Sequence, residues 1–296
     1  MNSGKAAVPF RWDLVTPDQL GSLLEGIEPP DVPWRDEFVT CAGKVVARSG
    51  GGQLVFVGRS LDSMFDLLSG AFTEISQPKV ARFPVSFSRT GAFRNNGRWS
   101  RAALTPSERQ QAREILATAG AHPNDLARRQ RPLTFVDVVH AGGTFTDVFN
   151  VVRDWVEDER APWAVIRKKV RFIGVTSREK TSPNTWRWQQ HAPWTEQLPS
   201  SAVVNVSLDP HAWSYFGDHQ TKLHRTFRPK DWTADVDSPT RDEKTRLALA
   251  EAVSIVRYGR SRDGRQALAR VMSGEGALAE PWLRTLITHL NRSGAP

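Results

Sequence analysis

The sequence is poor in the features that mark secreted, metal-stapled or membrane-spanning proteins. It contains one cysteine, Cys41, among 296 residues, which excludes an internal disulfide and a cage of thiolate metal ligands. A free cysteine is usually a small buried hydrophobe, and we assign Cys41 no chemistry. No run of about 18 apolar residues exists, so no spanning helix is expected. Residues 1–9 lack an apolar stretch of signal-peptide length. These absences predict a cytoplasmic protein with no membrane partner.

What the sequence does contain is arginine. Hydrophobic residues make up 39% and charged residues 24%, values typical of a globular chain. The length of 296 residues is enough for one large domain or two small ones. The net charge is +8, and 31 of the 40 basic residues are Arg. The planar guanidinium grips phosphate oxygens with two hydrogen bonds, so this composition suits anionic ligands. A genome rich in GC base pairs would also raise the Arg content, and composition alone does not separate the two explanations.

Apolar patterning divides the chain into three zones. Residues 1–33 are Pro-rich with one short helical stretch, and residues 233–296 are mainly helical. The central zone, 34–208, alternates continuous apolar runs, typical of strands buried on both faces, with amphipathic helices. The predicted strands are 54–57, 80–87, 133–139, 170–175 and 202–206, and the predicted helices are 36–48, 61–72, 105–119, 144–159, 241–258, 265–272 and 281–291. Pro84 places the second strand at an edge. Strands separated by such helices predict an α/β fold with a mainly parallel sheet flanked by helices.

One segment, residues 133–146, carries most of the chemical information. A buried strand delivers Asp137 and His140, and a turn containing Gly142 and Gly143 then opens a helix at Thr144. Glycines let backbone N–H groups approach a ligand closely, and the helix start adds unpaired donors and partial positive charge. The pattern therefore favours phosphate binding, with the carboxylate placed to accept hydrogen bonds from sugar hydroxyls. The alternative is a plain strand–turn–helix junction, because short Gly motifs match by chance.

The same segment resembles the phosphoribosyl-pyrophosphate (PRPP) loop of type I phosphoribosyltransferases. That loop has four apolar residues, two acids, two apolar residues, a variable residue and then Thr-Gly-Gly/Lys-Thr. Aligned from Thr144, the two glycines and Asp137 match, while Val136 replaces the first acid and Ala141 the first Thr. The resemblance implies that Asp137 binds ribose hydroxyls and that His140 is a candidate general base. It also implies a 5′-phosphate site at Ala141, Gly142, Gly143, Thr144, Phe145 and Thr146.

Two more segments fit the family's order along the chain. Arg59 and Ser60 directly follow the strand at 54–57. They resemble the pyrophosphate-binding loop of the family, which follows a strand that comes before the PRPP loop. A long basic loop at 86–101 stands where the family has a mobile loop that closes over pyrophosphate. The alternative for that loop is a solvated basic segment. The resemblance thus implies a pyrophosphate site formed by Arg59, Ser60, Arg89, Arg94 and Arg98.

The acceptor side of the site is less defined in the sequence. Arg178 and Lys180 follow the strand at 170–175 and are candidate acceptor-binding residues, because parallel strands end at one edge of a sheet. Residues 181–232 are rich in Trp and His and are our candidate for the hood with which this family selects its acceptor. Such aromatic density also packs cores. The spacing of the His residues matches no standard metal pattern, and we predict no metal ligands there.

The resemblance, which covers about residues 50–180, implies transfer of 5-phosphoribose from PRPP to an unidentified small-molecule acceptor. Mg²⁺ would be the cofactor, bridging the pyrophosphate, and a homodimer is compatible with it. Val136 in place of an acid favours the alternative, a non-catalytic PRPP or nucleotide sensor. Arg residues spread along the chain and the lack of a known module argue against nucleic acid as a partner.

Overall fold

The structure is a computed structural model. It describes residues 8–32, 34–87, 93–95, 98–100, 103–181, 187–232 and 240–292, without the side chains of residues 93–95, 98–100, 180 and 181. In the described residues, no helix is long and apolar enough to cross a membrane. The predicted side-chain contacts of Arg89, Arg94, Arg98 and Lys180 lie outside this description.

A five-stranded parallel sheet forms the centre of the protein, as predicted, in the order β2-β1-β5-β6-β7. β2 lies at one edge and ends directly before Pro84, which cannot donate a ladder hydrogen bond. The strands are β1 (Gln53–Val57), β2 (Val80–Phe83), β5 (Leu133–Val138), β6 (Val170–Ser177) and β7 (Val203–Leu208).

The strands are continuously apolar because both faces of the sheet are buried. Along β1, Val55 and Val57 belong to one hydrophobic cluster and Leu54 and Phe56 to another. The first cluster includes side chains of α3 (Pro106–Thr118) and α5 (Gly143–Asp158), and the second includes side chains of α1 (Arg35–Arg48) and α2 (Asp62–Ala71). Successive side chains of a strand point to opposite faces of the sheet, so each strand contributes to both hydrophobic clusters.

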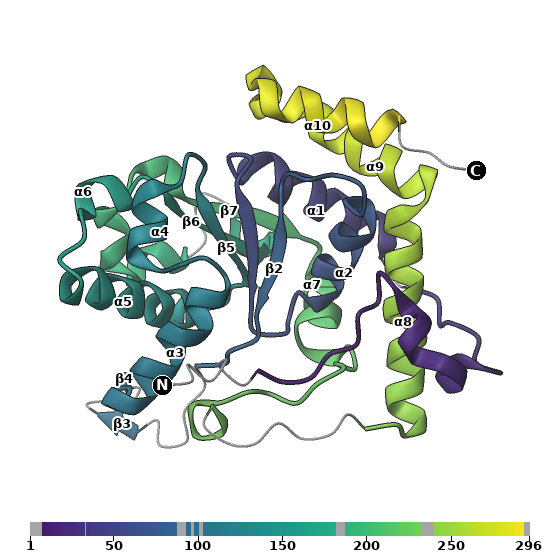
Figure 1. Cartoon of the computed structure of the whole chain (residues 1–296), viewed down its shortest axis with the longest axis horizontal. Helices are drawn as coiled ribbons and strands as arrows, with labels where there is room; N and C mark the ends of the chain where they lie inside the picture. Colours follow the sequence, from purple (N-terminus) through teal and green to yellow (C-terminus); the bar gives the residue numbers. More distant parts are fainter. Residues whose placement is uncertain are drawn as a thin grey trace.

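Helices cover both faces of this sheet (Figure 1). α3 and α5 lie on one side together with two short helices that the sequence did not predict, α4 (Pro123–Arg128) and α6 (Trp163–Ile166). α1 and α2 lie on the other side. α3 begins with a capping box, in which Thr105 and Glu108 satisfy each other's backbone N–H groups. The long loop after β2 contains a small antiparallel hairpin of β3 (Phe93–Asn95) and β4 (Arg98–Ser100).

The C-terminal helices add a further layer over α1 and α2. α8 (Glu243–Arg260) packs on α2, and α9 (Arg262–Ser273) packs on α1 and on α10 (Pro281–Arg292). α2 and α8 approach so closely that a Cβ on Gly70 would lie 2.1 Å from the Val256 carbonyl oxygen. The N-terminal segment, with the 3₁₀ helix η1 (Pro17–Leu24), wraps around α8 (Figure 1).

Candidate functional site

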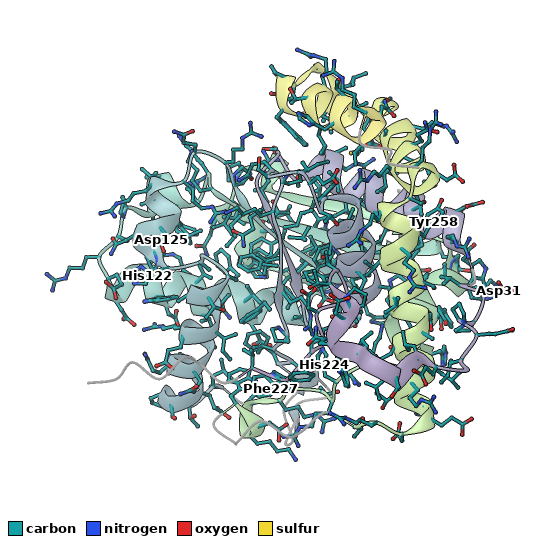
Figure 2. All side chains as sticks on the ribbon, turned by 45° about the vertical axis from the view of Figure 1, so that its right-hand side comes forward. Asp31, His122, Asp125, His224, Phe227 and Tyr258 are labelled. Carbon is teal, nitrogen blue, oxygen red and sulfur yellow. The ribbon has the colours of Figure 1, made fainter. Side chains whose placement is uncertain are left out.

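A large cavity lies where three parallel strands end. If the five strands of the sheet are numbered 1 to 5 along the chain, their order in the sheet is 2-1-3-4-5. The connections that follow the adjacent strands β1 and β5 pass over opposite faces of the sheet. Ligands of open α/β proteins bind at such a point, beyond the carboxyl ends of the strands. The cavity has a volume of about 960 Å³ and is lined by the end of β5, by residues that follow β1, β2 and β5, and by residues 213, 217–227, 240, 242, 244 and 245. Figure 2 labels His224 and Phe227, two residues of its lining, near one another at the lower end of the molecule.

Asp137 stands one residue before the end of β5 and lines the cavity while being only 6% exposed. Its Oδ1 accepts a hydrogen bond from its neighbour's backbone, Val138 N, at 2.8 Å. Burial raises the pKa of this carboxyl well above its usual value, and the single hydrogen bond only partly opposes the effect. No cation of the described residues forms an ion pair with Asp137. Such a carboxyl has acceptor capacity to spare for a ligand's hydroxyl groups.

The turn after β5 needs glycine at Gly142. This residue has φ +75°, in the left-handed region, and directly precedes the first turn of α5. A Cβ on Gly142 would lie 2.4 Å from Cε3 of Trp188, a core residue that is 2% exposed. The neighbouring Gly143 is the first residue of α5 and has no positive φ. The first N–H groups of a helix have no partner within it, and this turn presents those of α5 to the cavity.

Thr146 supports this turn from below and does not line the cavity. Its hydroxyl donates to Gly142 O at 3.0 Å and accepts from Trp194 Nε1 at 2.9 Å. Both capacities of the hydroxyl are thus engaged by the protein. Of the residues predicted to hold the 5′-phosphate, those from Ala141 to Phe145 line the cavity, and Thr146 positions them.

The loop after β1 brings Arg59 and Ser60 to the same cavity, although β1 and β5 are far apart in sequence. Arg59 is half-buried, and its Nη1 donates to the His224 carbonyl oxygen at 2.9 Å. Burial lowers the pKa of Arg59, but arginine is not deprotonated in proteins, so the guanidinium stays charged at neutral pH. The Ser60 carbonyl accepts from Lys222 Nζ at 3.0 Å, which ties this loop to residues 217–227.

Lys222 is a buried cation held by neutral oxygens. Besides Ser60 O, its Nζ donates to Phe216 O at 2.6 Å and to Gln220 Oε1 at 2.9 Å. Burial lowers its pKa to about 8. The three hydrogen bonds use all three ammonium protons, so Lys222 has none left to donate to a ligand.

A network of buried charges lies beneath Arg59 and centres on Asp62. Arg82 Nε lies 3.2 Å from Asp62 Oδ1, and Arg11 donates to Asp66 Oδ2 at 2.6 Å. Burial alone would raise the pKa of Asp62, but the charge of Arg82, the hydrogen bond with His224 and the charge of Arg11 outweigh burial and lower that pKa. His224 Nε2 contacts Arg82 Nη2 and lies 3.1 Å from Asp62 Oδ2. The other ring nitrogen, Nδ1, lies 3.0 Å from the carbonyl oxygen of the next residue.

His140 and the predicted acceptor residues have different positions. His140 is exposed and lines the cavity next to the turn. Arg178 does not line it: the guanidinium forms an ion pair with Glu37 on α1. Three indoles of the Trp-rich segment, those of Trp188, Trp194 and Trp232, are buried in the protein. From that segment it is residues 213 and 217–227 that line the cavity.

The described residues contain no group of three or more His, Cys, Asp or Glu side chains that could hold a metal ion. A magnesium ion bound with a pyrophosphate ligand is a different case, because substrate phosphates and water supply most of its ligands. The lining contains the carboxyl groups of Asp137, Asp218 and Asp242, which is compatible with that arrangement.

Comparisons of this chain with protein-family models, with curated proteins and with solved structures give no match. The case for a function therefore depends on the geometry of the cavity.

Proposed function

We propose that this protein binds PRPP in the cavity at the ends of β1, β2 and β5 and transfers its 5-phosphoribosyl group to a small-molecule acceptor. One observation carries the proposal. The turn at 139–145, with a carboxylate before it, and the loop bearing Arg59 face the same cavity. A phosphorylated sugar with a second anionic group needs a phosphate cradle, a hydroxyl acceptor and a cation, and these three features meet here.

The pairing of the charges around Arg59 supports an anionic ligand. The buried cations Arg11 and Arg82 lie against the buried acids Asp62 and Asp66. Arg59 has no carboxylate partner among the described residues, and its hydrogen bond goes to a carbonyl. Its guanidinium lines the cavity. An unpaired, half-buried guanidinium is suited to a phosphate or pyrophosphate group.

In the proposed reaction, a nucleophile on the acceptor forms a bond to C1 of the ribose while the bond from C1 to the pyrophosphate oxygen breaks. Positive charge develops on the sugar and negative charge on the departing pyrophosphate. Arg59 stabilises the departing group, and Asp137 holds the ribose hydroxyls so that C1 keeps its orientation. His140, at the edge of the cavity, is placed to take the proton that the acceptor loses. Bound Mg²⁺ would add positive charge at the pyrophosphate.

A second candidate function is a PRPP or nucleotide sensor without turnover. Val136 favours it, because this apolar residue stands where the transferases have the first acid of their loop. Its side chain is fully buried in the cluster formed with α1 and α2. Its place on the opposite face of β5 leaves Asp137 as the one carboxylate that this strand brings to the cavity. A sensor would use the same binding contacts and would release no pyrophosphate.

Isothermal titration calorimetry with PRPP and Mg²⁺, compared with ribose 5-phosphate and with inorganic pyrophosphate, tests the proposal. We expect PRPP to bind more tightly than either fragment, because it uses the turn at 139–145 and Arg59 together. A PRPP affinity equal to that of ribose 5-phosphate would refute a joint site. Pyrophosphate release in the presence of a pool of nitrogen nucleophiles then separates the transferase from the sensor.

A further inference from the structure

The opposite edge of the sheet, where the strands begin, carries a concentration of positive charge. Residues 128–131 read Arg-Arg-Gln-Arg and residues 167–171 read Arg-Lys-Lys-Val-Arg. The two segments together hold seven cations and no acid. We call them the basic edge. It lies at the amino ends of β5 and β6, whereas the cavity lies at the carboxyl ends of β1, β2 and β5.

The fold brings these two segments together. β5 and β6 are adjacent parallel strands, and their first residues, Leu133 and Val170, are partners in the ladder. Lys169 bridges the segments directly, because its Nζ donates to Gln130 O at 3.3 Å. The helices that precede them, α4 and α6, also contact each other. Cations that are separated in the sequence therefore form one surface.

Part of this charge has a structural role, and part does not. Arg129 donates to Gly120 O, Arg131 to Gly51 O and Arg171 to Arg48 O, at 3.1 to 3.3 Å. These carbonyls lie at or just after the ends of α1 and α3, where positive charge is favourable.

Arg128 and Lys168 are different from those cations. Both side chains are exposed, and neither makes a hydrogen bond or an ion pair with another described residue. None of the seven cations of the basic edge pairs with a carboxylate of the described chain, although Asp125 and Glu280 act on Arg129 and Arg171 from a longer distance.

We propose that the basic edge binds the phosphate backbone of a nucleic-acid duplex without reading its sequence. Five of the seven cations are Arg, whose fork matches phosphate oxygens, and three of these are held in place by backbone carbonyls. A duplex offers a rigid array of closely spaced phosphates that such a preformed set of cations can meet together. The inference does not depend on the proposed function of the cavity. It differs from the expectation drawn from the spread of Arg along the chain, because the fold gathers five of the 31 Arg residues at the basic edge.

Fluorescence anisotropy of a labelled duplex DNA of about 20 base pairs, titrated with the full chain, tests this surface, with duplex RNA of the same length as a second probe. The test variant is Arg128→Ala/Lys168→Ala. Its matched control is Lys230→Ala/Arg257→Ala, which removes the same charge from exposed residues elsewhere. Equal thermal midpoints for the three proteins verify folding.

Each lost phosphate contact lowers the slope of log K against log salt by about 0.9, so the test variant should lower it by about 1.8. The same relation predicts about 60-fold weaker binding near 0.1 M salt. The control should keep the wild-type slope. Equal losses in both variants would show an effect of net charge alone and would overturn the assignment, as would no binding at low salt. Tighter binding to vesicles containing phosphatidylserine than to either duplex would also overturn it.

Discussion

Replacing Gly142 by alanine tests whether the phosphate turn is set by the core beneath it. Two costs are expected. A residue with φ +75° is strained once it has a Cβ, by about 1–2 kcal/mol. The new methyl group would also lie 2.4 Å from Cε3 of Trp188. This indole cannot move away freely, because its Nε1 donates to Asn205 Oδ1 at 2.9 Å and its ring is buried in the core. Overpacking of this kind costs about 1–3 kcal/mol.

Gly58 supplies a matched control for the first cost. It has φ +69°, and the nearest heavy atom to an added Cβ is the Val85 carbonyl oxygen at 3.9 Å, an ordinary contact. Gly58→Ala should therefore lose about 1–2 kcal/mol from backbone strain alone, and Gly142→Ala about 2–5 kcal/mol. Urea unfolding followed by circular dichroism measures both, provided that the m value is unchanged. Equal losses in the two variants would show that Trp188 does not constrain the turn.

Three further predictions concern side chains around the cavity. Asp137→Asn should raise the thermal midpoint at pH 8 and have little effect near pH 4. The reason is that the pKa of Asp137 is raised in the folded state, so the native state loses stability as pH rises from about 3.8 through the folded-state pKa. An equal effect of the substitution at both pH values would contradict this sign. Thr146→Val should cost about 1–3 kcal/mol by leaving Trp194 Nε1 without a partner and removing one of the two hydrogen bonds to Gly142 O, whereas Thr146→Ser should keep wild-type stability in the same urea assay. Asp62→Ala should cost about 3–5 kcal/mol, because it leaves the buried Arg82 without its carboxylate partner, and a loss under about 1 kcal/mol would show that this ion pair does not stabilise the fold.

The sheet could be predicted because its signal is local. Each strand buried on both faces is a continuous apolar run, and each helix of the central zone has its own amphipathic pattern, so all five strands were expected near their observed positions. The turn at Gly142 was also visible, since a strand, a Gly pair and a helix start follow one another directly. α4 and α6 were missed because helices of 6 and 4 residues are too short for a periodic apolar face.

The remainder of the site depends on long-range contacts that no local pattern reports. Lys222 reaches Ser60 O across 162 residues, and Trp188 fits against Gly142 only because the chain returns past the end of β5. The Trp-rich segment was noticed, but composition could not separate indoles that support the turn from indoles that would cover a ligand. The basic edge was missed for the same reason. Its two halves become neighbours only through the pairing of β5 with β6.

The central claim is that one ligand spans the turn at 139–145 and the loop bearing Arg59. The measurement that tests it most directly is calorimetry of Arg59→Ala with PRPP·Mg²⁺ and with ribose 5-phosphate. Arg59 would meet only the pyrophosphate end, so PRPP affinity should fall by about 10-fold or more, the loss of one charge-assisted hydrogen bond, while ribose 5-phosphate binds as to the wild type. Equal weakening of both ligands would place Arg59 elsewhere and contradict the account.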